Sequence, residues 1–143
     1  MLTVKIQKVT DAAIIPSYAH PGDAGVDLYA AEDAVLMPGE RKLVRTGIKI
    51  AVPKGYEAQV RPKSGLALKH GLSIVNTPGT IDAGYRGEVG VICINLGNEA
   101  IKIEAGKKIA QMVFKKIETV KFEEAEELDG TSRGEGGFGS TGH

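Results

Sequence analysis

Residues 76–88 read Asn-Thr-Pro-Gly-Thr-Ile-Asp-Ala-Gly-Tyr-Arg-Gly-Glu, a stretch dense in glycine. Apolar runs at Leu72–Val75 and Val89–Leu96 flank it, which predicts that the two runs pair as a hairpin. Asp82 and Tyr85 are three residues apart in the turn, among glycines that let a ligand approach the backbone closely. A carboxylate, a flat ring and bare backbone together indicate a pocket for a sugar or base, with a water molecule that can be activated.

Short β-leaning segments recur along the chain and are separated by Gly, Pro, Asn or Asp. Several alternate apolar and polar residues, the two-residue period of half-buried strands. The predicted strands are Leu2–Val9, Val26–Ala30, Ala34–Met37, Arg41–Val52, Tyr56–Val60, Leu72–Val75, Val89–Leu96, Ala100–Ile103 and Lys108–Ile117. They predict an all-β sandwich or barrel. One short helix is expected at Ser64–His70, closed by Gly71, whereas the acidic Glu123–Leu128 is expected to be solvated.

Composition limits the function classes. A chain of 143 residues is a single domain by length. Eighteen basic and eighteen acidic residues cancel, so no net field draws the protein to nucleic acid or to a membrane. The single Cys93 is expected to be buried and fits a reducing compartment. Without a signal-peptide pattern or an apolar span, we expect a cytoplasmic protein. His20, His70 and His143 lack the spacing of a zinc site.

The composition changes at Gly130, because six of the last fourteen residues are glycine. This predicts a β domain over residues 1–129 and a flexible segment over residues 130–143. Composition alone favours a mobile terminus. Arg133, Phe138 and Ser140 nevertheless offer a cation, a ring and a hydroxyl beside curved backbone, which are the parts of a phosphate cradle. The segment is not a P-loop, because no Gly-Lys-[Ser/Thr] sequence ends it.

Five segments together resemble the motifs of the trimeric dUTPases, which hydrolyse dUTP to dUMP and pyrophosphate. They are Pro21-Gly-Asp-Ala-Gly-Val-Asp-Leu-Tyr-Ala30, Arg61-Pro-Lys-Ser-Gly-Leu-Ala67, residues 76–88, Gly106-Lys-Lys-Ile-Ala-Gln-Met-Val-Phe114 and Arg133-Gly-Glu-Gly-Gly-Phe-Gly-Ser-Thr-Gly142. They follow the family's order and cover the chain almost end to end. The resemblance implies a distorted jelly-roll barrel assembled as a homotrimer, with a role in supplying dUMP and keeping uracil out of DNA. Each active site would take the first, second and fourth motifs from one subunit, the third from its neighbour and the fifth from the remaining chain.

From the residues alone, Asp82 is either a general base for water or a turn aspartate that binds local N–H groups. The resemblance implies the base, with attack on the α-phosphorus. It also implies that Tyr85 packs under the deoxyribose and excludes a ribose 2′-hydroxyl. The uracil slot would be lined by Asn76, Gly79, Thr80, Ile81 and Gly90, whose fixed donors and acceptors read the edge of the base.

Lys63-Ser64-Gly65 begins the predicted helix, where N–H groups favour an anion, although a plain serine cap is the simpler interpretation. The resemblance implies contacts with the α and β phosphates. The family most often has arginine in place of Lys63, and lysine lacks the bidentate fork. Asp27 alone indicates an outward-facing strand residue, and Gln111 an edge-facing one. The resemblance instead implies that Asp27 orders the water around a Mg²⁺ held mainly by the triphosphate, and that Gln111 holds the site together.

The resemblance further implies that the glycine-rich tail closes over bound nucleotide as a lid. Arg133 would neutralise the γ-phosphate and Phe138 would stack on the uracil ring. Gly139 and Ser140 would add contacts to the nucleotide.

Two alternative functions stay open at this point. A dCTP deaminase shares the fold, but it needs a base that activates water at C4 of cytosine, and the Arg-Ser-Ser segment of that branch is absent. A non-catalytic nucleotide-binding β-trimer would have no use for a base beside the α-phosphate. Release of pyrophosphate from dUTP, of ammonia from dCTP, or neither would separate the three.

Overall fold

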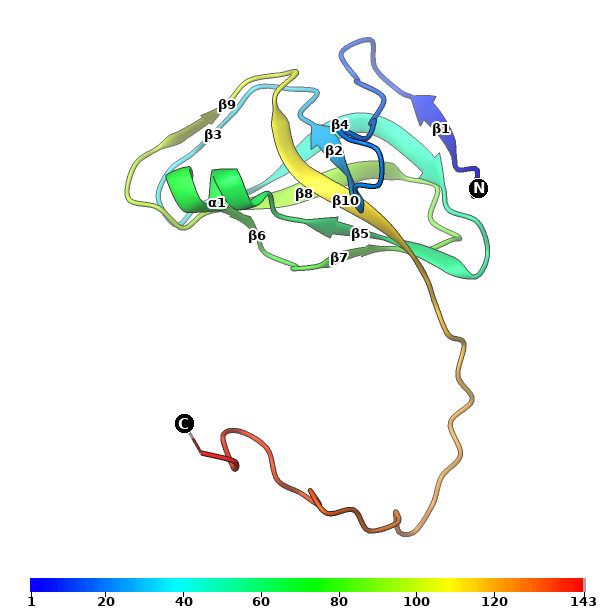
Figure 1. The fold of residues 1–143 in the computed structure, drawn as a ribbon. Helices are drawn as coiled ribbons and strands as arrows, with labels where there is room; N and C mark the ends of the chain where they lie inside the picture. The colour runs from blue at the N-terminus through cyan, green and yellow to red at the C-terminus, as the bar shows by residue number, and fades with distance from the viewer. Residues whose placement is uncertain (143) are drawn as a thin grey trace.

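Two four-stranded antiparallel sheets, a two-stranded ribbon and one short helix make up the regular structure (Figure 1). The structure is a computed structural model and describes residues 1–142. In chain order the elements are β1 (Lys5–Lys8), β2 (Gly25–Tyr29), β3 (Ala34–Leu36), β4 (Arg41–Ala51), β5 (Tyr56–Arg61), α1 (Ser64–His70), β6 (Leu72–Ile74), β7 (Gly79–Ile81), β8 (Glu88–Asn95), β9 (Ile101–Ile103) and β10 (Lys108–Lys116). The prediction of an all-β fold is confirmed.

The first sheet has the strand order β1-β4-β8-β6 and the second has the order β2-β10-β5-β7, while β3 pairs with β9. Every pairing is antiparallel. Neighbours in each sheet are mostly far apart in sequence, as in the β10–β2 pair. The sheets therefore bring early and late segments of the chain side by side, and this places the site residues.

The core lies between the sheets, because alternate side chains along the strands point inward. Strand β8 shows the pattern most clearly, with Val89, Val91, Cys93 and Asn95 buried and the residues between them half-buried. The expectation that Cys93 is buried is confirmed, and burial raises the pKa of its thiol to about 12. Asn95 is the polar member of the set, and its side-chain amide donates to the carbonyl oxygens of Leu36 and Glu99 at 3.0 and 2.7 Å.

The predicted helix is confirmed at Ser64–His70. It ends at Gly71, whose φ of 70° is left-handed and whose N–H bonds back to the carbonyls of Leu66 and Ala67, a conformation that glycine adopts without strain. The serine cap is wrong, because Ser64 is the first helical residue and Lys63 occupies the cap position without a side-chain cap bond.

The predicted hairpin is correct in its pairing but wrong in its turn. Strand β6 pairs with β8, with Leu72 opposite Asn95. Between these strands the chain crosses to the second sheet, where Gly79–Ile81 forms β7 and pairs with β5. The segment thus joins the two sheets, and Asp82 stands directly after the end of β7.

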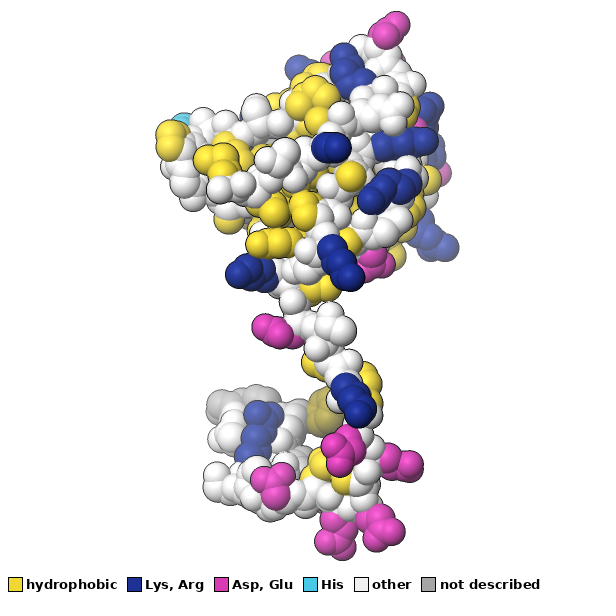
Figure 2. Space-filling model, turned by 90° about the vertical axis from the view of Figure 1, so that its right-hand side faces the viewer, with side chains coloured by type: hydrophobic (Ala, Val, Ile, Leu, Met, Phe, Trp, Pro, Cys, Tyr) yellow, Lys and Arg dark blue, Asp and Glu magenta, His cyan; other side chains and the backbone are white. Residues whose placement is uncertain are grey.

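Beyond β10 the chain leaves the body of the molecule as an extended arm (Figure 1). Residues 117–142 contain no helix or strand. The acidic Glu123–Leu128 is exposed throughout, as expected of a solvated stretch, and acidic side chains gather on this arm in Figure 2. The division at Gly130 stays a prediction. Among residues 1–142, no helix is long and apolar enough to span a membrane.

Candidate functional site

The segment around β7 lines a groove against β8. One cavity of about 180 Å³ is bordered by Thr80, Ile81, Asp82, Tyr85, Glu88, Val89 and Gly90. A second, of about 60 Å³, shares Thr80, Ile81 and Gly90 with the first and adds Asn76 and Gly79 among others. The structure therefore brings together every residue that the sequence assigned to the uracil slot, to the sugar and to the activated water.

Within this groove the Asp82 side chain is exposed, and its carboxylate makes no hydrogen bond or ion pair within residues 1–142. Its backbone carbonyl accepts a 3.1 Å hydrogen bond from the Tyr85 N–H, so the backbone alone closes the turn. Within residues 1–142 the Asp82 side chain does not bind the local N–H groups, as it would in a turn aspartate. Asp82 thus lines the groove with a carboxylate that has no partner in residues 1–142.

The Tyr85 side chain is held at its hydroxyl end. Its hydroxyl donates to the backbone carbonyl of Glu88 at 2.8 Å. Its ring lies so close to Gly87 that a Cβ there would stand 2.3 Å from the hydroxyl oxygen. Any larger residue at this position would displace the ring, which accounts for one of the glycines in the opening stretch.

A second cluster forms on the sheet that contains β2 and β10. Asp27 is only 8% exposed, and two lysines hold it. The Lys63 ammonium bonds to one carboxylate oxygen, and the Lys108 ammonium lies 3.1 Å from the other. Burial alone would raise the pKa of Asp27, but the hydrogen bonds from both lysines outweigh it, and the pKa lies below its ordinary value. The outward-facing Asp27 that strand alternation suggests is wrong, because its carboxylate is buried against Lys63 and Lys108.

Gln111 completes the second cluster. It stands opposite Asp27 on one neighbouring strand and opposite Arg61 on the other. The edge-facing interpretation is therefore wrong, since β10 is a central strand. The Gln111 side-chain amide donates to the carbonyl of Pro62 at 2.8 Å, and this fixes the backbone that leads into Lys63. Ser64 and Gly65 follow, both exposed at the start of α1.

Two residues at these clusters escaped the sequence interpretation, Lys108 and Glu88. Lys108 reaches Asp27 through the register of β10 on β2, which shifts between Lys108 and Ala110. No spacing rule on one strand shows such a shift. Glu88 is the last residue of the stretch 76–88, and its position there indicates only the start of a strand. Its carboxylate nevertheless accepts hydrogen bonds from Arg45, which is far away in sequence.

The tail residues lie apart from both clusters. Within residues 130–142 the hydrogen bonds are local, for example from Arg133 Nε to the Gly136 carbonyl at 2.7 Å. Phe138 is fully exposed and has a left-handed φ of 52°. Neither the cavity of about 180 Å³ nor that of about 60 Å³ beside β7 is lined by Asp27, Lys63 or a tail residue. A single chain thus holds the predicted site as three separate parts.

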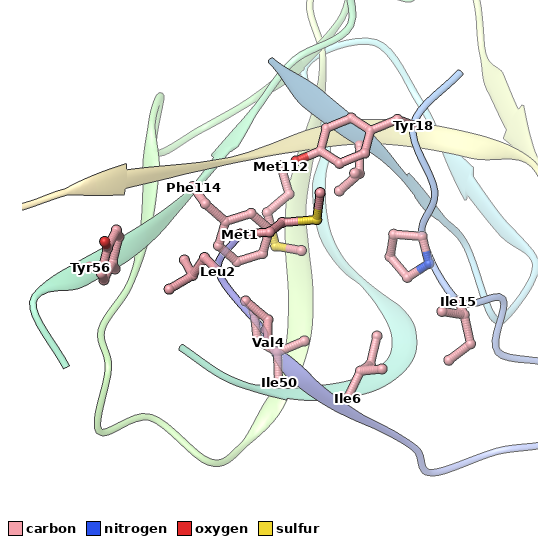
Figure 3. Close-up of a pocket in the computed structure, with 12 residues that line it drawn as sticks. Met1, Leu2, Val4, Ile6, Ile15, Tyr18, Ile50, Tyr56, Met112 and Phe114 are labelled. Carbon is pink, nitrogen blue, oxygen red and sulfur yellow. The ribbon is translucent and has the colours of Figure 1, made fainter. Parts of the chain in front are cut away.

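An apolar groove of about 570 Å³ lies elsewhere, where side chains of the N-terminal segment and of β10 converge (Figure 3). Val26 and Met112 line it. Their sequence neighbours Asp27 and Gln111 point to the opposite face of the same strands, since side chains alternate. The face at the N-terminal side shows apolar side chains in the open, framed by Lys and Arg (Figure 2). The groove contains none of the predicted site residues.

Metal-binding groups are sparse in the described part of the chain. No three His, Cys, Asp or Glu side chains gather there. His20 and His70 are both exposed, and His143 lies outside the described residues.

Comparison with known proteins gives one family. The sequence profile of the dUTPase family matches residues 11–142. The deoxyuridine 5'-triphosphate nucleotidohydrolase of Clostridium novyi (strain NT) is 62% identical over 137 residues, which cover 96% of each chain. The dUTPase of Staphylococcus bacteriophage 80alpha, solved with dUPNHPP, superposes over the whole of both chains with a TM-score of 0.94 and 30% identity. A variant dUTPase from phage phi11 of S. aureus, solved to describe coordination of a structural Mg(II) ion, covers 89% of this chain and 99% of its own, with a TM-score of 0.83 and 27% identity.

Proposed function

Because the chain belongs to the dUTPase family and hydrolyses dUTP to dUMP, we propose that Asp82 is the general base of this reaction. The water oxygen forms a bond to the α-phosphorus, and Asp82 takes the proton. The bond from that phosphorus to the bridging oxygen breaks, and pyrophosphate leaves. The observation that carries the proposal is the Asp82 carboxylate, which lines the groove without a partner in residues 1–142.

The groove beside Asp82 recognises the deoxyuridine. Uracil enters the part lined by Asn76, Gly79, Thr80, Ile81 and Gly90, where fixed backbone donors and acceptors match its edge. A cytosine there would leave buried polar groups unpaired. The sugar lies against Tyr85, whose ring is held over Gly87 and leaves no space or partner for a 2′-hydroxyl.

The triphosphate binds at the second cluster. Lys63 and the N–H groups of Ser64 and Gly65 receive the α and β phosphates, and Gln111 keeps this backbone in place through Pro62. Arg133 neutralises the γ-phosphate, Phe138 stacks on the base, and Gly139 and Ser140 complete the closure. Support for the lid comes from the tail's exposure and its purely local hydrogen bonds, since no hydrogen bond of residues 130–142 reaches the barrel.

Asp27 fits a role at a Mg²⁺ that arrives with the nucleotide. Mg²⁺ retains several waters and is usually bound by one or two carboxylates together with substrate phosphates. One buried, ionised carboxylate beside two lysines matches that requirement. Bound Mg²⁺ supplies charge neutralisation on the phosphates. Asp27 would order the water around it once Lys63 and Lys108 turn from the carboxylate toward the phosphates.

The assembly we propose is a homotrimer with shared sites. The Asp82 groove, the Asp27 cluster and the tail are separate in one chain, so a complete site needs parts from neighbouring subunits. The exposed apolar groove of Figure 3 supports this assembly, because apolar patches of that kind commonly mark protein contacts. The buried, unpaired thiol of Cys93 fits a reducing compartment, and we place the enzyme in the cytoplasm.

The reaction in ¹⁸O-labelled water tests the proposed chemistry. Attack on the α-phosphorus places the label in dUMP, whereas attack on the β-phosphorus places it in pyrophosphate. The same preparation, assayed on a panel of nucleoside triphosphates with Mg²⁺, should release pyrophosphate from dUTP and no ammonia from dCTP. Label in pyrophosphate would overturn the assigned position of the water and of Asp82.

A further inference from the structure

Strand β8 pairs irregularly with β4 near its start. Arg45 stands opposite Gly90, and the next regular pair along β4 is Lys49 opposite Glu88. Three residues of β4 therefore face the single residue Val89 of β8. Such a bulge interrupts the ladder of hydrogen bonds at Val89, so side-chain contacts there add to the single Lys49–Glu88 pair in holding the start of β8.

Side chains close this gap. The Glu88 carboxylate accepts bonds from Arg45 Nε at 3.0 Å and Arg45 Nη2 at 2.9 Å, the two-pronged geometry of strong arginine–carboxylate pairs. It also accepts the backbone N–H of Gly47 at 3.1 Å. The Thr46 hydroxyl donates to the Val89 carbonyl. The hydrogen bond from Arg45 is the main cause that keeps the pKa of Glu88 below its ordinary value.

This arrangement sets the position of Tyr85. The acceptor for the Tyr85 hydroxyl is the backbone carbonyl of Glu88 itself, and Glu88 lines the same cavity as Asp82 and Tyr85. Movement of the Glu88 backbone would therefore carry the hydroxyl, and with it the ring, away from Gly87. Arg45 contacts the Glu88 carboxylate from the neighbouring strand and does not line the groove.

We propose that the Arg45–Glu88 ion pair determines how strictly the enzyme rejects ribonucleotides, with both side chains acting as positioning residues for Tyr85. The inference rests on the proposed role of Tyr85 as the ring that reads the sugar. With the ion pair intact, the ring stands where a 2′-hydroxyl would go. Without it, the start of β8 shifts in the bulge and opens space for that hydroxyl.

The test is the ratio of kcat/KM for dUTP to kcat/KM for UTP, which a general loss of stability would not move. In Arg45→Gln we expect this ratio to fall about tenfold, mainly because UTP turnover rises. Arg45→Lys should recover part of the ratio, since lysine keeps the charge but not the fork. Arg41→Gln is the matched control, because Arg41 is an exposed arginine on the same strand with no ion pair in residues 1–142. Its ratio should equal that of the wild type.

Tyr85→Ala separates the inference from the proposed function. An unchanged ratio in Tyr85→Ala would remove the proposed role of Tyr85. A lowered ratio in Tyr85→Ala together with wild-type ratios in Arg45→Gln and Glu88→Gln would overturn the ion-pair inference alone. Thermal unfolding of each variant shows whether it is folded. If Arg45→Gln does not fold, Arg45→Lys is used to test the inference instead. A wild-type ratio in Arg45→Lys would then contradict it.

Discussion

The Lys63 ammonium donates a hydrogen bond to the Asp27 carboxylate, 36 residues earlier in the chain. This contact ties the segment that leads into α1 to strand β2. Lysine at position 63 therefore has a partner in the protein before any phosphate arrives. Its charge offsets that of a buried carboxylate, which is costly to leave unpaired.

Removing this partner should destabilise the protein. In Lys63→Met, Asp27 keeps only Lys108, and we expect the free energy of unfolding to fall by about 1.5–3 kcal/mol, the size of a hydrogen bond to a charged group. Urea unfolding at neutral pH measures the change. Lys69→Met is the control, because Lys69 is exposed on α1 without an ion pair in residues 1–142. Equal losses in the two variants would mean that the contact contributes nothing to stability.

The pH dependence of stability should carry the signature of Asp27. Its pKa in the folded chain lies below the ordinary value of 3.8, so the folded state binds the proton less tightly than the unfolded state does. The stabilisation is fully present above pH 3.8 and is lost as the pH falls through the lower, folded pKa. The difference in unfolding free energy between wild type and Asp27→Asn should therefore shrink on acidification below about pH 4. A constant difference down to pH 2 would contradict this.

Asp82→Asn should remove turnover while binding persists. Asparagine keeps the size of the side chain but cannot accept the proton from water, so kcat should fall by about 10²–10⁴. Calorimetry with a non-hydrolysable dUTP analogue should give an affinity close to that of the wild type. Asp11→Asn, at an exposed turn, controls for the loss of one surface carboxylate. Turnover near the wild-type rate in Asp82→Asn would place the base elsewhere.

Deleting the residues after Gly130 should leave the barrel and its assembly folded, since residues 131–142 form hydrogen bonds only among themselves. Catalysis should suffer, because Arg133 and Phe138 leave with it. Loss of one stacking contact of about 1–3 kcal/mol lowers kcat/KM roughly ten- to hundredfold. Circular dichroism and size-exclusion chromatography check the fold, and steady-state kinetics check the activity. Unchanged kinetics in the truncated chain would show that the tail is no lid.

Local signals in the sequence predict much of this fold, and the features they miss depend on how the strands pair. Apolar runs, several of them alternating, locate nine strands, and Gly71 marks the end of α1. Strand β7 was missed because it is three residues long and begins with a glycine, in a stretch whose other signals all indicate a turn. Its existence depends on pairing with β5, which no property of residues 79–81 reveals.

The site residues also differ in how far the sequence predicts them. Residues of the Asp82 groove are close in sequence, so one stretch sufficed to find them. Alternation alone predicts an outward-facing Asp27, because it gives a side chain's direction but not what covers it. Lys108 meets Asp27 only after the register shift in β10, and Glu88 meets Arg45 only across a bulge. A periodic sequence pattern does not predict contacts that depend on a register shift or a bulge.

The place of Cys93 between the sheets has a practical consequence. Peroxide and alkylating reagents attack the thiolate of an accessible cysteine, and this sulfur is neither exposed nor readily ionised. The enzyme should keep its full activity in buffers without reductant, and an oxidative burst that silences thiol-dependent enzymes should leave it working.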